Sequence, residues 1–220
     1  MKTIVLVRHA TAIEREAGLP DFDRTLIKKG LKESRKTARQ FSFYTIIPEI
    51  WISSSAPRAL ETATIFADRI KYPRQDILQE ESLYQENSSS AYLTLTQSLP
   101  KNKSSVVYFG HEPGISEFAA LLVKDFKLDF PKAGILGISM AAESWDRLTD
   151  AEGFITFIEF PGSGKEVSKI LKTHLTHYLF EENQKILTSL TPKIDKKLKK
   201  LLISCSTQVA KSLVKRHTKK

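Results

Sequence analysis

The alternation of short β-rich apolar runs with longer segments of helical periodicity most constrains the fold of the first 160 residues. This pattern is typical of an α/β domain whose mainly parallel sheet is flanked by helices on both faces. We expect strands at 3–7, 50–54, 105–109, 135–140 and 154–160. We expect helices at 29–43, 57–71, 90–99 and 114–123.

The pattern changes after the Pro-Gly-Ser-Gly stretch at 161–164, which predicts a linker. Beyond it, two apolar helical stripes follow each other without a strand between them. We therefore predict one domain at 1–162 and a helical C-terminal extension of two helices at 163–220. Residues 161–220 contain 14 Lys and Arg against 4 Asp and Glu, whereas 1–160 contain 20 against 21. This basic tail could bind a polyanion or an acidic partner, or could be a solvated helix face.

Three features of the whole chain bear on its location. The longest apolar runs are too short for a membrane span, and the N-terminal run is too short for a secretory signal. Cys205 is the single cysteine, so no internal disulfide can form, which favours a reducing compartment. We expect a cytoplasmic protein without a membrane span.

Charged and titratable side chains follow three of the predicted strands. Arg8 and His9 follow the first strand, Arg58 follows the second, and His111 follows the third. Because the carboxyl ends of parallel strands meet at one edge of a sheet, we expect these four side chains to share a crevice.

Two guanidinium groups and two imidazoles suit a phosphoryl group. Arginine forks bind phosphate oxygens in pairs, although a carboxylate-binding pocket would use the same arginines. His9, as a neutral imidazole, could attack phosphorus and form a covalent intermediate, while a protonated His111 would stabilise the developing charge. No Cys cluster or HExxH spacing accompanies the histidines, so we expect no metal and no cofactor.

Three motifs resemble the histidine phosphatase (phosphoglycerate mutase-like) superfamily: Arg-His-Ala at 8–10, SSAPRALETA at 54–63 and GHEPG at 110–114. The stretch DFDRTLIKKG at 21–30 is similar to the segment after the first motif in the SixA-type phosphohistidine phosphatase branch. The resemblance covers about 1–160 and implies a catalytic domain with the phosphoglycerate mutase-like fold. It implies that His9 is the phosphorylated nucleophile and that Arg8, Arg58 and His111 form the phosphate pocket.

Two further assignments stay open at this point. Glu81, in a Glu-Ser-Leu-Tyr segment, is a candidate general acid by its loose similarity to a Glu-x-x-Tyr segment of the superfamily, with Glu80 and Glu86 as rivals. Arg24 either adds a third cation at the pocket entrance, as the resemblance implies, or pairs with a nearby aspartate to shape the loop.

Three functions are compatible with these residues. The leading one is hydrolysis of phosphohistidine on a protein through a covalent intermediate on His9. The second keeps the mechanism but takes a small phosphomonoester metabolite as substrate. The third is an adaptor that recognises phosphate and uses its basic tail to bind a polyanion or a protein.

Overall fold

The computed structural model describes residues 1–15, 18–44 and 47–161. Apart from Pro161, the predicted linker lies outside these residues, as do the two predicted helices of the extension, so the division into two domains stays a prediction. In the described ranges, no helix is long and apolar enough to cross a membrane.

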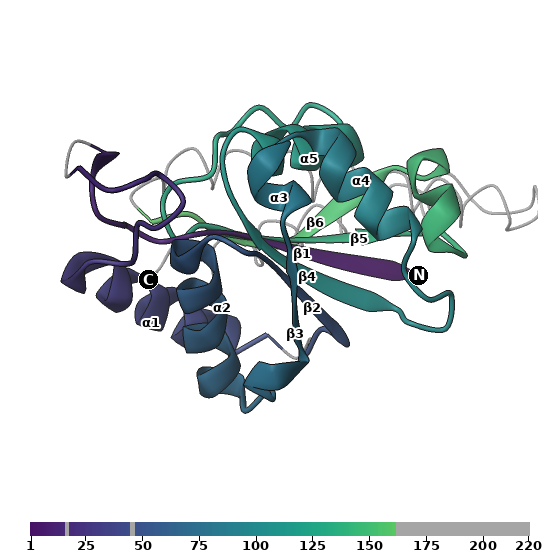
Figure 1. Cartoon of the computed structure of the whole chain (residues 1–220). Coiled ribbons are helices and arrows are strands. Elements are labelled where there is room, and N and C mark those ends of the chain that lie inside the picture. The colour runs from purple at the N-terminus through teal and green to yellow at the C-terminus, as the bar shows by residue number, and fades with distance from the viewer. Residues whose placement is uncertain (16–17, 45–46, 162–220) are drawn as a thin grey trace, which may run out of the picture. The chain divides into compact units, whose positions relative to one another are not determined.

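A six-stranded sheet with the order β3-β2-β4-β1-β5-β6 forms the centre of the described domain (Figure 1). β1 pairs in parallel with β4, β4 with β2, and β2 with β3, whereas β5 is antiparallel to both β1 and β6. Every residue of β4 and β5 is buried, as expected for strands covered on both faces. The expected mainly parallel α/β fold is thus confirmed. The strands are β1 (Lys2–Arg8), β2 (Ile50–Ser54), β3 (Ile77–Glu80), β4 (Ser105–Gly110), β5 (Ile135–Met140) and β6 (Gly153–Glu159).

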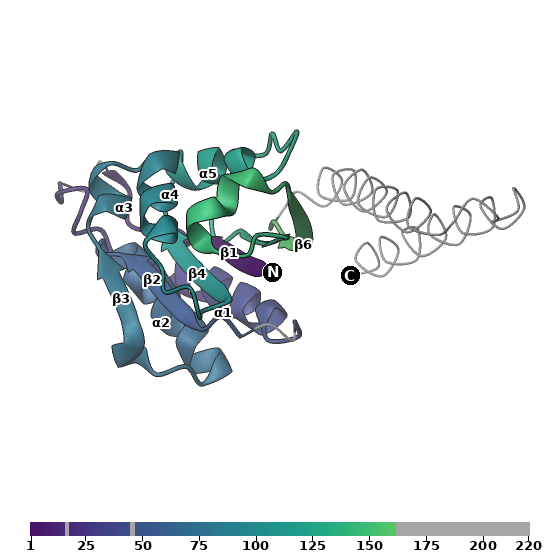
Figure 2. The ribbon, with the colours of Figure 1, turned by 90° about the vertical axis from the view of Figure 1, so that its right-hand side faces the viewer.

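Helices cover both faces of this sheet (Figures 1 and 2). α1 (Lys28–Phe41) and α2 (Pro57–Ile70) lie on one face, and α3 (Ser82–Gln85), α4 (Ser89–Gln97) and α5 (Gly114–Leu122) lie on the other. Pro57 occupies the first turn of α2 and Pro113 directly precedes α5, where a missing backbone N–H costs little. Two short 3₁₀ helices, η2 (Arg74–Asp76) and η3 (Trp145–Asp150), complete the described elements.

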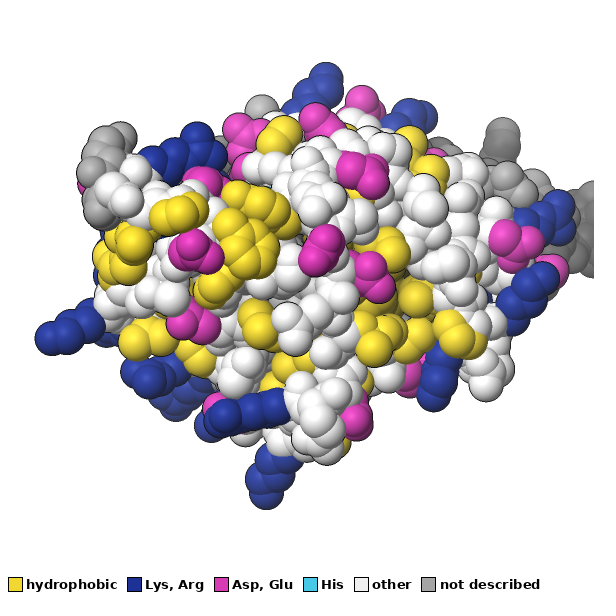
Figure 3. All heavy atoms as spheres, viewed as in Figure 1, with side chains coloured by type: hydrophobic (Ala, Val, Ile, Leu, Met, Phe, Trp, Pro, Cys, Tyr) yellow, Lys and Arg dark blue, Asp and Glu magenta, His cyan; other side chains and the backbone are white. Residues whose placement is uncertain are grey.

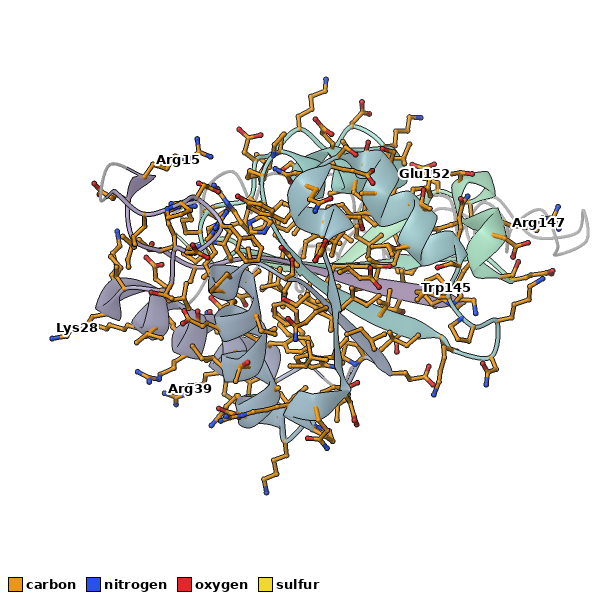
Figure 4. All side chains as sticks on the ribbon, in the orientation of Figure 1. Arg15, Lys28, Arg39, Trp145, Arg147 and Glu152 are labelled. Carbon is orange, nitrogen blue, oxygen red and sulfur yellow. The ribbon has the colours of Figure 1, made fainter. Side chains whose placement is uncertain are left out.

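Aromatic side chains fill both layers of the core. On the side of α1 and α2, Trp51 stacks on Phe109 with ring centroids 5.4 Å apart. On the other side, Tyr92 stacks on Phe118 at 5.4 Å. Trp51 and Trp145 are both fully buried, and each donates its indole N–H to a backbone carbonyl (Figure 4 labels Trp145). Both tryptophans are thus packing residues of the core.

The sequence patterns did not predict β3. This strand has four residues and lies at the edge of the sheet, with Leu78 52% exposed, so it lacks the apolar run of a buried strand. Its parallel register with β2 places Glu80 opposite Ser54. The segment that contains Glu81 therefore follows a strand end at the same sheet edge as the three motifs.

The loop between β1 and α1 is fixed by close backbone contacts. Gly30 lies so near this loop that a Cβ atom would fall 2.0 Å from the Thr11 carbonyl oxygen, which explains a glycine inside a helix. Glu61 of α2 accepts a 2.6 Å hydrogen bond from the Leu26 backbone N–H. Thr62 accepts one from the Ala10 N–H at 3.2 Å. Residues of the second motif, at 54–63, thus hydrogen-bond to the backbone of the first motif and of the loop that follows it.

Candidate active site

The four side chains singled out at strand ends lie at one edge of the sheet. β1, β4 and β2 are parallel neighbours, and their register pairs Arg8 with Gly110, directly before His111. The ring centroids of His9 and His111 are 5.0 Å apart. Arg58 lies in the first turn of α2, just after β2, and its charge lowers the pKa of both histidines. The structure brings the predicted set together.

His9 is arranged as a nucleophile. Its side chain is 4% exposed, and Nδ1 lies 2.8 Å from the Ala10 carbonyl oxygen. Because a carbonyl only accepts, Nδ1 carries the proton and Nε2 keeps its lone pair. Burial lowers the pKa of His9 far below its usual value, and the charges of Lys132 and His111 lower this pKa further. The ring is therefore neutral at physiological pH.

His111 is held by Ser54, a partner that the sequence did not identify. Nε2 of His111 lies 2.8 Å from the Ser54 hydroxyl oxygen, which also accepts the Ala56 backbone N–H at 3.2 Å. The hydroxyl hydrogen is free to be donated to Nε2, and in that arrangement Nδ1 carries the ring proton. Nδ1 is buried and has no hydrogen-bond partner in the described part of the chain.

The protonation of His111 differs from our expectation. Burial, together with the charges of Arg58 and Lys132, lowers the pKa of His111 to about 3, so the protein alone favours the neutral ring. A protonated His111 would need the negative charge of a phosphoryl group beside it. The neutral tautomer still offers its Nδ1–H as a hydrogen-bond donor.

In both Arg8 and Arg58, terminal guanidinium nitrogens are hydrogen-bonded to the protein, whereas Nε has no partner among the described residues. Arg8 donates to the Phe130 carbonyl, and Arg58 donates to Asp21. The Nε atoms of both arginines are buried and have no partner among the described residues. Buried N–H groups without a partner are costly and uncommon in folded proteins. Nδ1 of His111 is likewise without a partner there, so all three nitrogen atoms remain available to hydrogen-bond a ligand.

Asp21 ties the loop before α1 to this pocket. Its Oδ2 accepts hydrogen bonds from Arg58 and from the Tyr84 hydroxyl, both at 3.0 Å. Its Oδ1 lies 2.7 Å from Arg24 and 2.9 Å from Arg15. Burial would raise the pKa of Asp21, but Tyr84 and the three arginines outweigh it and hold this pKa at about 2. Arg24, which is 9% exposed, thus pairs with Asp21, and Asp21 in turn contacts Arg58.

Lys132 is a further cation that the sequence reasoning missed. It is half-buried in a turn in which Gly134 donates to the Pro131 carbonyl at 2.8 Å, and its neighbour Ala133 donates to the His9 carbonyl at 3.3 Å. Burial and the charges of the nearby arginines lower the pKa of Lys132 to about 8. Because β5 is antiparallel to β1, its first residues lie where β1 ends, which a topology prediction could have shown.

The candidate general acid does not contact these groups. Glu81 is exposed and accepts a 3.2 Å hydrogen bond from Gln85, and Glu86 is also exposed. From the same segment, Tyr84 contacts Asp21, and its ring centroid lies 5.7 Å from that of His111. The role of Glu81 as an acid stays a prediction.

Sequence comparison gives one relative of limited similarity. No family model matches the chain. An uncharacterised protein of Picosynechococcus sp. is 28% identical over 152 residues, which cover 67% of this chain and 91% of the relative. The similarity falls short of establishing a family by sequence.

Solved structures show the fold. A protein of Agrobacterium tumefaciens that is assigned as the phosphohistidine phosphatase SixA matches with a TM-score of 0.62 and 22% identity, over 73% of this chain and 98% of that one. The protein histidine phosphatase SixA in complex with tungstate matches with a TM-score of 0.58 and 20% identity, over 72% and 97%. A mycobacterial glucosyl-3-phosphoglycerate phosphatase matches with a TM-score of 0.51 and 12% identity, over 70% and 97%. The described residues therefore have the histidine phosphatase (phosphoglycerate mutase-like) fold that the SixA structures share.

Proposed function

We propose that this chain is a SixA-type histidine phosphatase that hydrolyses phosphohistidine on a protein through a covalent intermediate on His9. The observation that carries the proposal is the neutral, buried His9 ring, which keeps a lone pair on Nε2 and lies 5.0 Å from the His111 ring and close to the charges of Lys132 and Arg58. Structures described as SixA share the fold, and one of them is a complex with tungstate, an oxyanion like phosphate.

The reaction would proceed in two displacements. The Nε2 lone pair of His9 attacks phosphorus while the bond between phosphorus and the substrate nitrogen breaks, and the leaving imidazole keeps the electron pair and takes a proton from water. Water then attacks the phosphorylated His9 and gives one proton to the hydroxide left by the first step. The bond between Nε2 and phosphorus breaks, its electron pair returns to Nε2, and phosphate leaves. Arg8, Arg58 and Lys132 balance the charge on the phosphoryl oxygens in both steps.

The state of Asp21 favours a phosphorylated nitrogen over an alkyl phosphate. A leaving alkoxide needs a proton from an acid, but the carboxylate that contacts Arg58 has a pKa of about 2 and stays ionised. A leaving imidazole is only weakly basic and needs less help. Asp21 therefore cannot be the acid that an alkyl phosphate would need, which supports an N–P substrate.

Phosphate trapping tests the nucleophile. The full chain is mixed with a radiolabelled phosphohistidine peptide, quenched within milliseconds and assayed for acid-labile, alkali-stable phosphate on the protein. We expect label on the native chain and on the His174→Ala control, and none on His9→Ala. Label on His9→Ala, or normal turnover by it, would overturn the mechanism. No label on any chain would favour the adaptor function.

A substrate panel tests the leaving group. Rates are compared for a phosphohistidine peptide and for small phosphomonoesters, each with native protein and Glu81→Gln. We expect a higher kcat/KM for the peptide and rates within about twofold for the variant, because Glu81 lies outside the contacts of the pocket. A strict requirement for Glu81 with a preference for phosphomonoesters would instead identify a metabolite phosphatase.

Two proposals rest on sequence alone. The single cysteine of the chain favours a cytoplasmic location. The basic tail at 163–220 is proposed to extend the catalytic domain at 1–162 as two helices and to contact a polyanion or an acidic partner. Fractionation of cells with an antibody to the chain tests the first proposal, and binding assays with the tail deleted test the second.

A further inference from the structure

The outer face of α1 is strongly basic. Its six cationic residues recur at spacings of three, four and seven and form one stripe about 16 Å long. All six are exposed, and Figure 4 shows Lys28 and Arg39, near the two ends of the stripe, pointing away from the domain. We call these residues the α1 stripe: Lys28, Lys29, Lys32, Arg35, Lys36 and Arg39.

The charges of the α1 stripe destabilise α1. Every member has another cation three or four residues away, and like charges at these spacings repel. Lys28 and Lys29 also lie in the first turn, where the helix dipole favours acidic residues. Glu33 is the one acidic residue of α1. It accepts hydrogen bonds from the Thr11 backbone and hydroxyl, and within α1 it pairs with Lys29 alone, at 3.9 Å. Helix stability therefore does not explain the stripe.

An apolar patch joins the α1 stripe to the pocket. Leu19, Phe22 and Ile27, in the loop before α1, are 44%, 38% and 37% exposed. The Phe22 ring lies edge-on to Tyr84 at 5.1 Å, and the Tyr84 hydroxyl binds the aspartate that holds Arg58. Figure 3 shows hydrophobic side chains over this loop, with Lys and Arg side chains beyond them over α1. The surface over this loop is thus largely apolar, with acidic side chains among the apolar ones, and it is cationic farther out over α1.

We propose that the α1 stripe and the patch of Leu19, Phe22 and Ile27 bind the acidic surface of the phosphorylated protein substrate. This inference rests on the proposed function, which requires a protein to bring its phosphohistidine to His9. An apolar centre with a charged rim is the usual composition of a protein interface. Complementary charge on the substrate would steer its approach and fix its orientation.

Other occupants fit this surface less well. The tail of this chain carries 14 basic residues against 4 acidic ones in 161–220, so it would be repelled by the α1 stripe. Nucleic acid would match the cations and could stack a base on Phe22, but the aliphatic side chains of Leu19 and Ile27 offer it neither hydrogen bonds nor a stacking face. An acidic protein can pair its carboxylates with the α1 stripe and pack apolar side chains against the patch.

The test compares two peptides of equal length, each with one phosphohistidine, flanked by Glu and Asp or by Lys and Arg. They are assayed with the full native chain, with Lys28→Glu/Arg35→Glu in the α1 stripe, and with the control Lys101→Glu/Lys124→Glu. Both double variants change the net charge equally, and Lys101 and Lys124 are exposed and lie outside α1. In the stripe variant each new glutamate lies four residues before a cation, so α1 keeps its stability.

We expect the native chain and the control to prefer the acidic peptide by about tenfold in kcat/KM at low salt, mainly through KM, and the preference to shrink at high salt. The stripe variant loses the preference and melts at the same temperature as the native chain or higher. Equal kcat/KM for the two peptides with native protein would overturn the docking proposal while leaving the phosphatase intact.

A competition assay separates the two proposals. If no phosphohistidine peptide is hydrolysed, the unphosphorylated acidic peptide is added to the hydrolysis of p-nitrophenyl phosphate by the same three chains. Inhibition of the native chain and the control, but not of the stripe variant, supports the docking surface while the proposed substrate fails. Stronger competition from a DNA duplex of equal charge than from the acidic peptide would overturn the docking proposal.

Discussion

The Asp21 carboxylate lies 3.0 Å from a terminal nitrogen of the Arg58 guanidinium, and it also forms an ion pair with Arg24 at 2.7 Å and accepts a hydrogen bond from the Tyr84 hydroxyl. One acidic side chain of the loop before α1 therefore fixes two arginines and a tyrosine at the rim of the pocket. A substitution at Asp21 should therefore alter the positions of both this loop and Arg58.

Replacing Asp21 with asparagine should destabilise the protein in a pH-dependent way. The folded-state pKa of Asp21, about 2, is below its usual value, so the stabilisation is present above pH 4 and is lost as the pH falls towards 2. We expect Asp21→Asn to lower the free energy of unfolding by about 1–2 kcal/mol at pH 7, an estimate reduced for its one-third exposure. Urea denaturation measures this loss.

The exposed neighbour Asp23 provides the control for this experiment. Asp23→Asn should leave the free energy of unfolding within about 0.5 kcal/mol of the native value, as is usual for surface substitutions. The difference between the native chain and Asp21→Asn should shrink between pH 4 and pH 2. A difference that stays constant over this range would show that Asp21 acts through packing rather than through its charge.

Replacing Ser54 with alanine should slow the reaction without weakening binding much. A Ser54 hydroxyl that donates to Nε2 holds His111 in the tautomer that offers Nδ1–H to the substrate, so on this assignment its loss lets the ring adopt the unproductive tautomer. We expect kcat to fall about tenfold, which corresponds to about 1.4 kcal/mol, with KM within about twofold. Steady-state kinetics with a phosphohistidine peptide measure both constants.

Ser55 is a matched control, because its hydroxyl is buried and has no hydrogen-bond partner among the described residues. Ser55→Ala should keep kcat within about twofold of the native value. Equal losses in the two alanine variants would mean that any disturbance of this turn slows the enzyme, and the tautomer argument would then fail.

Much of the fold could be predicted because its signals are local. Runs such as 50–54 and 135–140 match β2 and β5 residue for residue, since each is an apolar segment buried on both faces. β3 could not be predicted in this way, because an edge strand of four residues with one exposed leucine has no periodic signature. The pairing that defines it comes from β2, a neighbour more than twenty residues away.

The site was predictable where a motif followed a strand, and not where it depended on tertiary contacts. Parallel strand ends predicted the meeting of His9, Arg58 and His111, which the structure shows. Lys132 has no motif and reaches the pocket because β5 runs antiparallel to β1. Likewise, the link from Asp21 to Arg58 joins a loop to a helix 37 residues later, a contact that no local pattern encodes.

The pH dependence of kcat/KM should reveal Lys132. With the pKa of Lys132 at about 8, the free enzyme loses this positive charge above pH 8, so kcat/KM for a phosphohistidine peptide should fall there. Because burial and nearby cations keep His9 neutral, no loss centred at pH 6.5 should accompany it. In the substrate complex the phosphoryl dianion raises the pKa of Lys132, so the fall in kcat should occur at a higher pH.

Two substitutions at Lys132 separate charge from shape. Lys132→Arg keeps a cation at all accessible pH values, so its kcat/KM should stay level up to about pH 10. Lys132→Met keeps the length without the charge, so it should be about tenfold slower at pH 7 and should lack the fall above pH 8. If Lys132→Met instead shows the same fall as the native chain, another group titrates near pH 8, and the charge of Lys132 plays no part in binding the phosphoryl group.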